Sequence, residues 1–468
     1  MDIFTVIIIP LIILFIFIFL PPPYKVLAAF VMSLNLFNFA PTEIQGIKLW
    51  DVGMILFFIA TIELLFRSKP KPRKMRLNQK LFMLFWIYLV IVFIYTLVFL
   101  PYPEMLSIKA ARHMVVGYCT IFTFILLFRD EESFRVFLLG LFVLVFLGTI
   151  VHIVQYFMKI TILFGYQREY LSNIRSIPIF IPLTIVFFVH NLIKLLSGAK
   201  LKLMELIFTS CAAISLLLTF TRGIYFMLGI ISLLLTGLLL LKLKLKISRL
   251  IMYLSMLLLF LFFLIFTGTL DSILNRGQET LNSLSGAYES VKSPNTFSFR
   301  RELLKERMAM VSERNPIMGF GFIHEEVAQR TLHWRVGTLS KNGKKALTTP
   351  DIAWANLITY TGFAGTALFI VWILGFIFSF PLRESLSYDY ASQSISTYCM
   401  AFYLSVLAML MLMMDSWIFS FDVEIPCFVI AGYWCCCDSL AALSQRKEGC
   451  CYNEYQINLV PAMDITKE

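Results

Sequence analysis

Charged residues are scarce in this sequence. Asp, Glu, Lys and Arg make up 15% of its 468 residues, whereas 59% are hydrophobic and the mean hydropathy is +0.81. A soluble domain does not need so much apolar surface, because a single hydrophobic core stops growing at about 250 residues. The composition excludes an ordinary soluble protein and predicts an all-α, polytopic membrane protein.

The sequence also lacks the patterns of several other classes. Its nine cysteines have neither metal-ligand nor disulfide-scaffold spacing. The N-terminus has no basic region and no small-residue cleavage site, so residues 3–20 are expected to form a retained first span. The net charge of +11 is spread over short loops and does not form one basic stripe, which argues against a nucleic-acid partner. No internal repeat or linker marks a second domain, so residues 1–468 are expected to form a single integral membrane domain.

Apolar stretches recur along most of the chain. A helix needs about 20 residues to cross a bilayer, and the sequence predicts about 12 to 13 such spans. The candidates are residues 3–20, 26–40, 52–66, 81–100, 114–128, 137–157, 177–195, 203–220, 224–241, 247–267, 353–380, 397–414 and 418–436. A long polar loop, residues 268–351, separates the tenth from the eleventh, and a polar tail, residues 437–468, follows the last.

Lys and Arg are unevenly distributed among the connecting segments. With the N-terminus outside, 21 of the 40 lie in predicted cytoplasmic segments and 7 in short outer loops. Cytoplasmic loops carry the excess of basic residues in membrane proteins, so we expect this orientation. The other 12 lie in the long loop, which then faces the extracytoplasmic side together with Arg222, while the tail is cytoplasmic.

The long loop contains one segment with a helical pattern. Apolar residues from Arg300 onward gather on one side of a helix drawn at 100° per residue. Pro316 and Gly319 are expected to end this helix. Arg307 and Arg314 fall inside its apolar sector, which leaves two interpretations open. The arginines of an interfacial helix can extend to lipid phosphates, or they can turn toward a bound diphosphate.

Several motifs follow one another in this part of the chain. They are Thr221-Arg222-Gly223, then Arg301 with Pro316, Gly319 and Gly321, then Asp351 with Gly362 and Gly365. In order and spacing, over residues 203–369, they resemble the O-antigen ligase and O-antigen polymerase superfamily. The resemblance implies a bacterial inner-membrane glycosyltransferase. Such an enzyme moves a glycan from an undecaprenyl-diphosphate carrier to an acceptor sugar at the outer face.

The resemblance also implies roles for particular residues. A departing lipid diphosphate gains negative charge, and fixed arginines stabilise that charge more in the transition state than in the ground state. The expected catalytic residues are Arg222, Asp351 as the base, and Arg301. The expected substrate-binding residues are Arg175, Arg300, Arg307, Arg314, Gly319, Gly321 and Trp354.

Each main assignment has a structural alternative. Arg222 can be a boundary residue that extends to the headgroups, and Asp351 can cap the next span. Trp354 can belong to the interfacial aromatic belt. His324 and His333 are alternative bases.

A metal site is a further alternative. Asp415, Asp422 and Glu424 place carboxylates near the predicted outer face, where they could bind a divalent cation. We expect a site without metal or cofactor, because the basic residues are the ones that lie in the motifs.

The chain departs from the ligases at two positions. Asp351 stands where they usually carry the His of a His-Asn pair, and Lys305 stands where they carry an aromatic residue. This favours a polymerase of O-antigen or another surface polysaccharide over a ligase to lipid A core. A lipid-linked glycan flippase or a non-catalytic partner of a polysaccharide synthase remains an alternative. The expected partners are the lipid-linked glycan, membrane lipids and a chain-length regulator or other assembly proteins.

Overall fold

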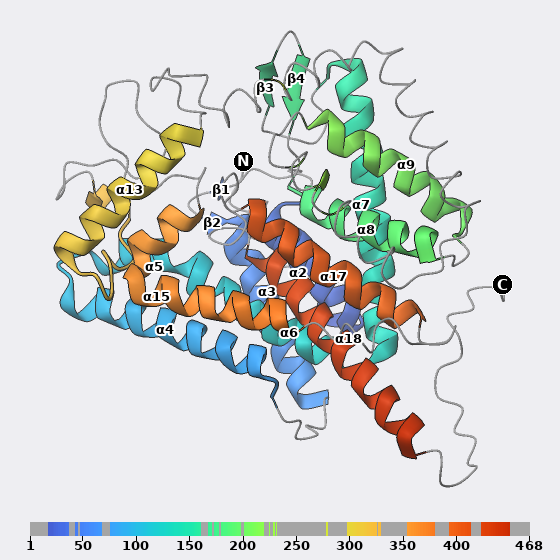
Figure 1. The fold of residues 1–468 in the computed structure, drawn as a ribbon, viewed down its shortest axis with the longest axis horizontal. Helices are drawn as coiled ribbons and strands as arrows, with labels where there is room; N and C mark the ends of the chain where they lie inside the picture. The colour runs from blue at the N-terminus through green and yellow to red at the C-terminus, as the bar shows by residue number, and fades with distance from the viewer. Residues whose placement is uncertain are drawn as a thin grey trace.

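A computed structural model places most of the chain in helices (Figure 1). It describes residues 17–36, 43–44, 47–67, 75–160, 167–170, 173–176, 179–197, 201–219, 224, 228–229, 231, 278, 297–324, 326–328, 353–379, 393–412 and 423–449. The predicted all-α fold class is confirmed. The predicted spans at residues 3–20, 224–241 and 247–267 lie almost entirely outside the described residues.

The secondary structure is a series of helices with two short hairpins. The helices are α2 (Pro22–Leu34), α3 (Leu49–Arg67), α4 (Leu77–Phe99), α5 (Glu104–Val115), α6 (Thr120–Leu127), α7 (Glu131–Met158), α8 (Ile181–Ser197), α9 (Leu203–Leu218), α13 (Phe297–Arg314), α15 (Ala353–Phe378), α17 (Gln393–Leu412) and α18 (Glu424–Gly449), with a short 3-10 turn η1 (Gly117–Cys119). The hairpins pair β1 (Glu43–Ile44) with β2 (Ile47–Lys48), and β3 (Gln167–Tyr170) with β4 (Asn173–Ser176). Both hairpins are antiparallel.

Five helical stretches are long and apolar enough to cross a membrane. They are α3, α4, the continuous stretch Glu104–Leu127, α7 and α15. Three shorter apolar helices, Ile181–Leu195, Leu203–Leu218 and Ile395–Leu410, lie among them. Lengths near 20 residues match the hydrocarbon thickness of a bilayer, so the chain is a multi-pass membrane protein.

The ends of two helices differ from the sequence expectation. Helix α2 begins at Pro22, four residues before the second span was expected to begin, because the first turn of a helix tolerates a missing N–H. Helix α18 continues to Gly449, past residue 436 where the last span was expected to end. Most of this extension, residues 437–449, consists of Ala, Leu, Gln, Arg, Lys and Glu, which favour helix without requiring lipid.

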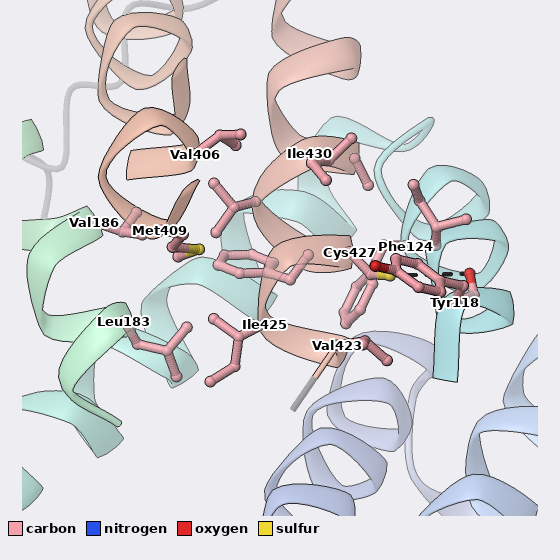
Figure 2. Close-up of a cluster of buried hydrophobic side chains, with 14 of the residues drawn as sticks. Tyr118, Phe124, Leu183, Val186, Val406, Met409, Val423, Ile425, Cys427 and Ile430 are labelled. Carbon is pink, nitrogen blue, oxygen red and sulfur yellow. Dashed lines mark hydrogen bonds between the residues drawn. The ribbon is translucent and has the colours of Figure 1, made fainter. Parts of the chain in front are cut away.

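Aromatic side chains fill the centre of the bundle. The ring of Phe124 lies 5.6 Å from that of Phe30, 5.8 Å from Phe137 and 5.7 Å from Phe428. Figure 2 shows the same core where α17 and α18 lie between α8 and α6, with Cys427 facing Tyr118. Such edge-on ring packing joins α2, α6, α7 and α18 by side chains alone.

Ion pairs join the ends of neighbouring helices. Three groups lie at predicted cytoplasmic ends: Lys25 and Arg67 with Glu63, Arg76 with Asp438, and Lys194 with Glu205. Arg112 and Asp51, 2.6 Å apart, lie at predicted outer ends. Among the described residues, no ion pair joins ends that the loop charges assign to opposite faces, so the contacts agree with the predicted grouping of the helix ends. Which face is cytoplasmic stays a prediction.

Candidate functional site

Helix α13 presents a buried stripe to the rest of the protein. Leu304, Arg307 and Val311 lie three or four positions apart, and α13 packs against α15 (Figure 1). Val311 is fully buried and Arg307 is only 1% exposed. Extension to lipid phosphates would require Arg307 to reach the surface, and it does not. The predicted helix and its end before Pro316 are confirmed.

The guanidinium of Arg307 is buried and forms no ion pair with a carboxylate among the described residues. Its Nη1 lies 3.5 Å from the sulfur of Met310. Its Nε and Nη2 have no hydrogen-bond partner in the described part of the chain. Burial lowers the pKa of Arg307 to about 10, against a smaller opposing effect of Glu306, so the group stays charged at neutral pH. A buried cation with open donors is costly by itself and is well suited to hold an anion.

Arg314, at the end of the same helix, is held differently. It is exposed, its Nη2 donates to the Tyr102 hydroxyl at 3.1 Å, and its guanidinium lies 4.9 Å from the centre of the Phe320 ring. Burial raises the pKa of Tyr102, and the positive charge of Arg314 opposes that rise. Arg314 therefore fixes the end of α13 to the residues that follow α4.

The turn after α13 is built by Asn315. Its side-chain oxygen accepts from the backbone N–H groups of Ile317 and Met318, each at 3.1 Å. Its side-chain nitrogen donates to the Tyr95 hydroxyl at 3.2 Å. These bonds satisfy the chain where Pro316 prevents the helix from continuing.

The turn is joined to α15 backbone to backbone. Phe320 N donates to Thr359 O and Phe363 N donates to Pro316 O, both at 2.8 Å. Gly319 and Gly362 lie face to face between these two bonds. We call this junction of residues 316–321 with residues 359–363 the glycine clasp.

The glycines of the clasp occupy conformations that other residues rarely adopt. The φ angles are +67° at Gly319, +67° at Gly321 and +65° at Gly362. A Cβ on Gly319 would lie 2.6 Å from Thr359 O, and one on Gly321 would lie 2.9 Å from a methyl carbon of Leu100. Close packing within the protein thus accounts for these glycines, and their contact with substrate stays a prediction.

Helix α15 is broken at Gly362, so the apolar stretch expected as one span over residues 353–380 is not one continuous helix. The rings of Trp354 and Phe369 are 5.6 Å apart, whereas fifteen residues of straight helix extend about 22 Å. The first segment, residues 353–361, therefore folds back along the second, as Figure 1 shows. Half-buried Trp354 packs edge-on against Phe369, and its stacking on a sugar stays a prediction.

Other predicted site residues fall outside the described parts of the chain. Arg222, Asp351 and His333 are not described, nor are Asp415 and Asp422. The structure gives only the backbone of the residues Arg175, Arg300 and Arg301. Arg300 and Arg301 lie in the first turns of α13, and Arg175 lies on β4 opposite Arg168.

The described elements show what these positions adjoin in the sequence. Asp351 precedes α15 by two residues, and α15 packs on α13. Arg222 follows Thr219, at the end of α9, by three residues, and α9 packs on α7, which also contacts β4. The closeness of Arg222 and Asp351 to the other predicted arginines stays a prediction.

Two other predicted residues are described and partnered. His324 Nδ1 accepts from the backbone N–H of Glu326 at 3.3 Å. Glu424 is fully buried and accepts from Trp50 Nε1 at 2.6 Å. Among the described residues, no three His, Cys, Asp or Glu side chains lie together as metal ligands.

Two polar residues within apolar spans, Tyr88 and His152, were not predicted to take part in the site. Tyr88 of α4 contacts the glycine clasp through its hydroxyl. His152 of α7 lies with its Nδ1 2.8 Å from Ser215 Oγ of α9, and both residues are fully buried. A polar or titratable residue inside a span is itself a signal, because the membrane interior penalises it.

Comparison with known proteins supports the resemblance. Residues 207–370 match a family model described as O-antigen ligase. The matched segment runs from α9 through α13 and the glycine clasp into α15. Over these residues the chain is similar to that family, and the resemblance inferred from the motifs is confirmed. No curated protein matches the chain.

Proposed function

We propose that this protein is a glycosyltransferase of the bacterial inner membrane. It transfers a glycan from an undecaprenyl-diphosphate carrier to an acceptor glycan. The observation that carries the proposal is the match of residues 207–370 to the O-antigen ligases, which spans the elements that hold most of the predicted site. Polysaccharide assembly from lipid-linked glycans is the activity that this match supports.

The buried charge of Arg307 supports the choice of donor. When an acceptor oxygen attacks the anomeric carbon, the bond from that carbon to the diphosphate oxygen breaks, and the leaving diphosphate gains charge. A guanidinium with open N–H groups can bind phosphate oxygens and stabilise that charge. Arg307, 1% exposed, has the open donors that such a role requires.

The remaining roles follow the motif assignments. Arg222 and Arg301 stabilise the leaving diphosphate, and Asp351 takes the proton of the acceptor hydroxyl. Arg175, Arg300 and Arg314 bind the donor, as do Gly319, Gly321 and Trp354. No metal ion or cofactor takes part.

The departure at Asp351 favours polymerisation over ligation. Loop 268–351 then lies on the extracytoplasmic side, where lipid-linked repeat units are joined, and the tail at residues 437–468 is cytoplasmic. A chain-length regulator or another assembly protein is the expected protein partner.

Reconstitution tests the proposal. Purified protein in liposomes receives an undecaprenyl-diphosphate repeat unit, with and without lipid A core, and products are separated on a gel. Chain extension means polymerase, and transfer to lipid A core means ligase. If neither product forms, a flippase or a scaffold is favoured. Activity that survives a chelator supports the metal-free site, whereas loss restored by magnesium or manganese contradicts it.

A further inference from the structure

Tyr88 connects α4 to both halves of the glycine clasp. Its hydroxyl lies 2.7 Å from Ile317 O and 3.0 Å from Thr361 O. The first carbonyl belongs to the turn after α13 and the second to α15 just before its break. One hydroxyl proton is therefore shared between two backbone oxygens that come from separate parts of the chain.

The break in α15 explains why a donor is needed there. In a continuous helix the carbonyl of residue 361 would accept from the N–H four residues later. Gly362, with φ 65° and ψ −167°, interrupts that ladder. Within a membrane protein a freed carbonyl must find a partner from the protein, because lipid offers no donor. Tyr88 is placed to supply it.

The packing around Tyr88 leaves little room for movement. A Cβ on Gly365 would lie 2.7 Å from the Tyr88 ring, so this glycine lets α15 approach α4 closely. The sulfur of Met318 lies 3.7 Å from the same hydroxyl. Ring and hydroxyl thus hold the turn and the broken helix in one register against α4.

The clasp joins two elements that hold or adjoin predicted site residues. Helix α13, with Arg307 in its buried stripe, leads into the turn, and the first segment of α15 leads back toward Asp351. We propose that Tyr88 is a positioning residue that fixes the α13 guanidinium groups relative to this segment of α15. This inference rests on the proposed function, because it assumes that both sides act on one glycan transfer.

The test compares Tyr88→Phe with Tyr95→Phe. Both changes remove one hydroxyl from α4. In the described structure the Tyr95 hydroxyl accepts from the side chain of Asn315, whereas the clasp carbonyls of Ile317 and Thr361 accept from Tyr88. Hydrogen exchange is followed in peptides that cover residues 315–324 and 353–365. Turnover and KM for the lipid-linked donor are measured on the same preparations.

We expect faster exchange in both peptides of Tyr88→Phe. A misplacement of about 1 Å can cost about 100-fold in rate, so turnover should fall about 10- to 100-fold while KM changes little. Tyr95→Phe should resemble wild type in both measurements. A second variant, Gly365→Ala, places a methyl group against the Thr361 side chain and the Tyr88 ring, and should reproduce both effects.

The two measurements separate the possible failures. Unchanged exchange in Tyr88→Phe and Gly365→Ala would overturn the clasp contact. Faster exchange with unchanged turnover would overturn the positioning role. A wild-type protein that transfers no glycan would remove the proposed function, and the exchange experiment would still decide whether Tyr88 holds the clasp.

Discussion

The aromatic core and the glycine clasp hold helices together in opposite ways. In the core, rings from α2, α6, α7 and α18 pack through side chains that can shift by small rotations. In the clasp, two backbones meet at Gly319 and Gly362 with no side chain between them. From this difference we expect the core to tolerate changes in side-chain volume and the clasp not to tolerate a single added methyl group.

The largest expected effect is that of Gly362→Ala. The new methyl group would overlap the Ile317 carbonyl oxygen, and a φ of +65° strains any residue with a Cβ by about 1 to 3 kcal/mol. We expect a large loss of thermal stability and no glycan product. Gly229→Ala is the matched control, because a Cβ there has nothing within 4 Å. Thermal unfolding by size-exclusion chromatography checks both, and a stable, active Gly362→Ala would show that the clasp is not rigid.

Arg307→Met should lower activity without lowering stability. The change removes a buried charge whose Nε and Nη2 are unsatisfied in the described structure, so stability should be equal to or greater than that of wild type. Loss of a preorganised charge at the leaving group should lower turnover by about 100- to 1000-fold. Unfolding temperature and initial rate are measured together. Wild-type turnover in this variant would remove Arg307 from the donor site.

The smallest expected effect belongs to the core. Phe124 is fully buried, and Phe124→Leu should cost about 1 to 2 kcal/mol because the neighbouring rings can partly close the space. Turnover per folded molecule should not change. A fall in turnover without a fall in stability would show that the core acts on the site, and the contrast between the two regions would weaken.

The sequence predicted those features that depend on local pattern. The helical spacing of its apolar residues was enough to predict α13, and Pro316 was enough to predict its end. The break in α15 could not be predicted in the same way. Gly362 lies in an apolar run, and its conformation depends on Gly319, 43 positions earlier.

The site was predicted less completely than the helices. An amphipathic pattern shows that one face of α13 is apolar but not what covers it, so the burial of Arg307 could not be predicted. Tyr88 reads as one more aromatic residue in a span until its hydroxyl is seen between two carbonyls. Both depend on contacts between segments that are distant in the chain.

The central claim is that arginines on this protein support glycan transfer from a lipid diphosphate. The most direct test reconstitutes wild type and Arg222→Ala at equal membrane-inserted amounts and supplies an undecaprenyl-diphosphate repeat unit. The account predicts a polysaccharide ladder from wild type and none from Arg222→Ala. An equal ladder from both proteins, or none from wild type, would contradict it.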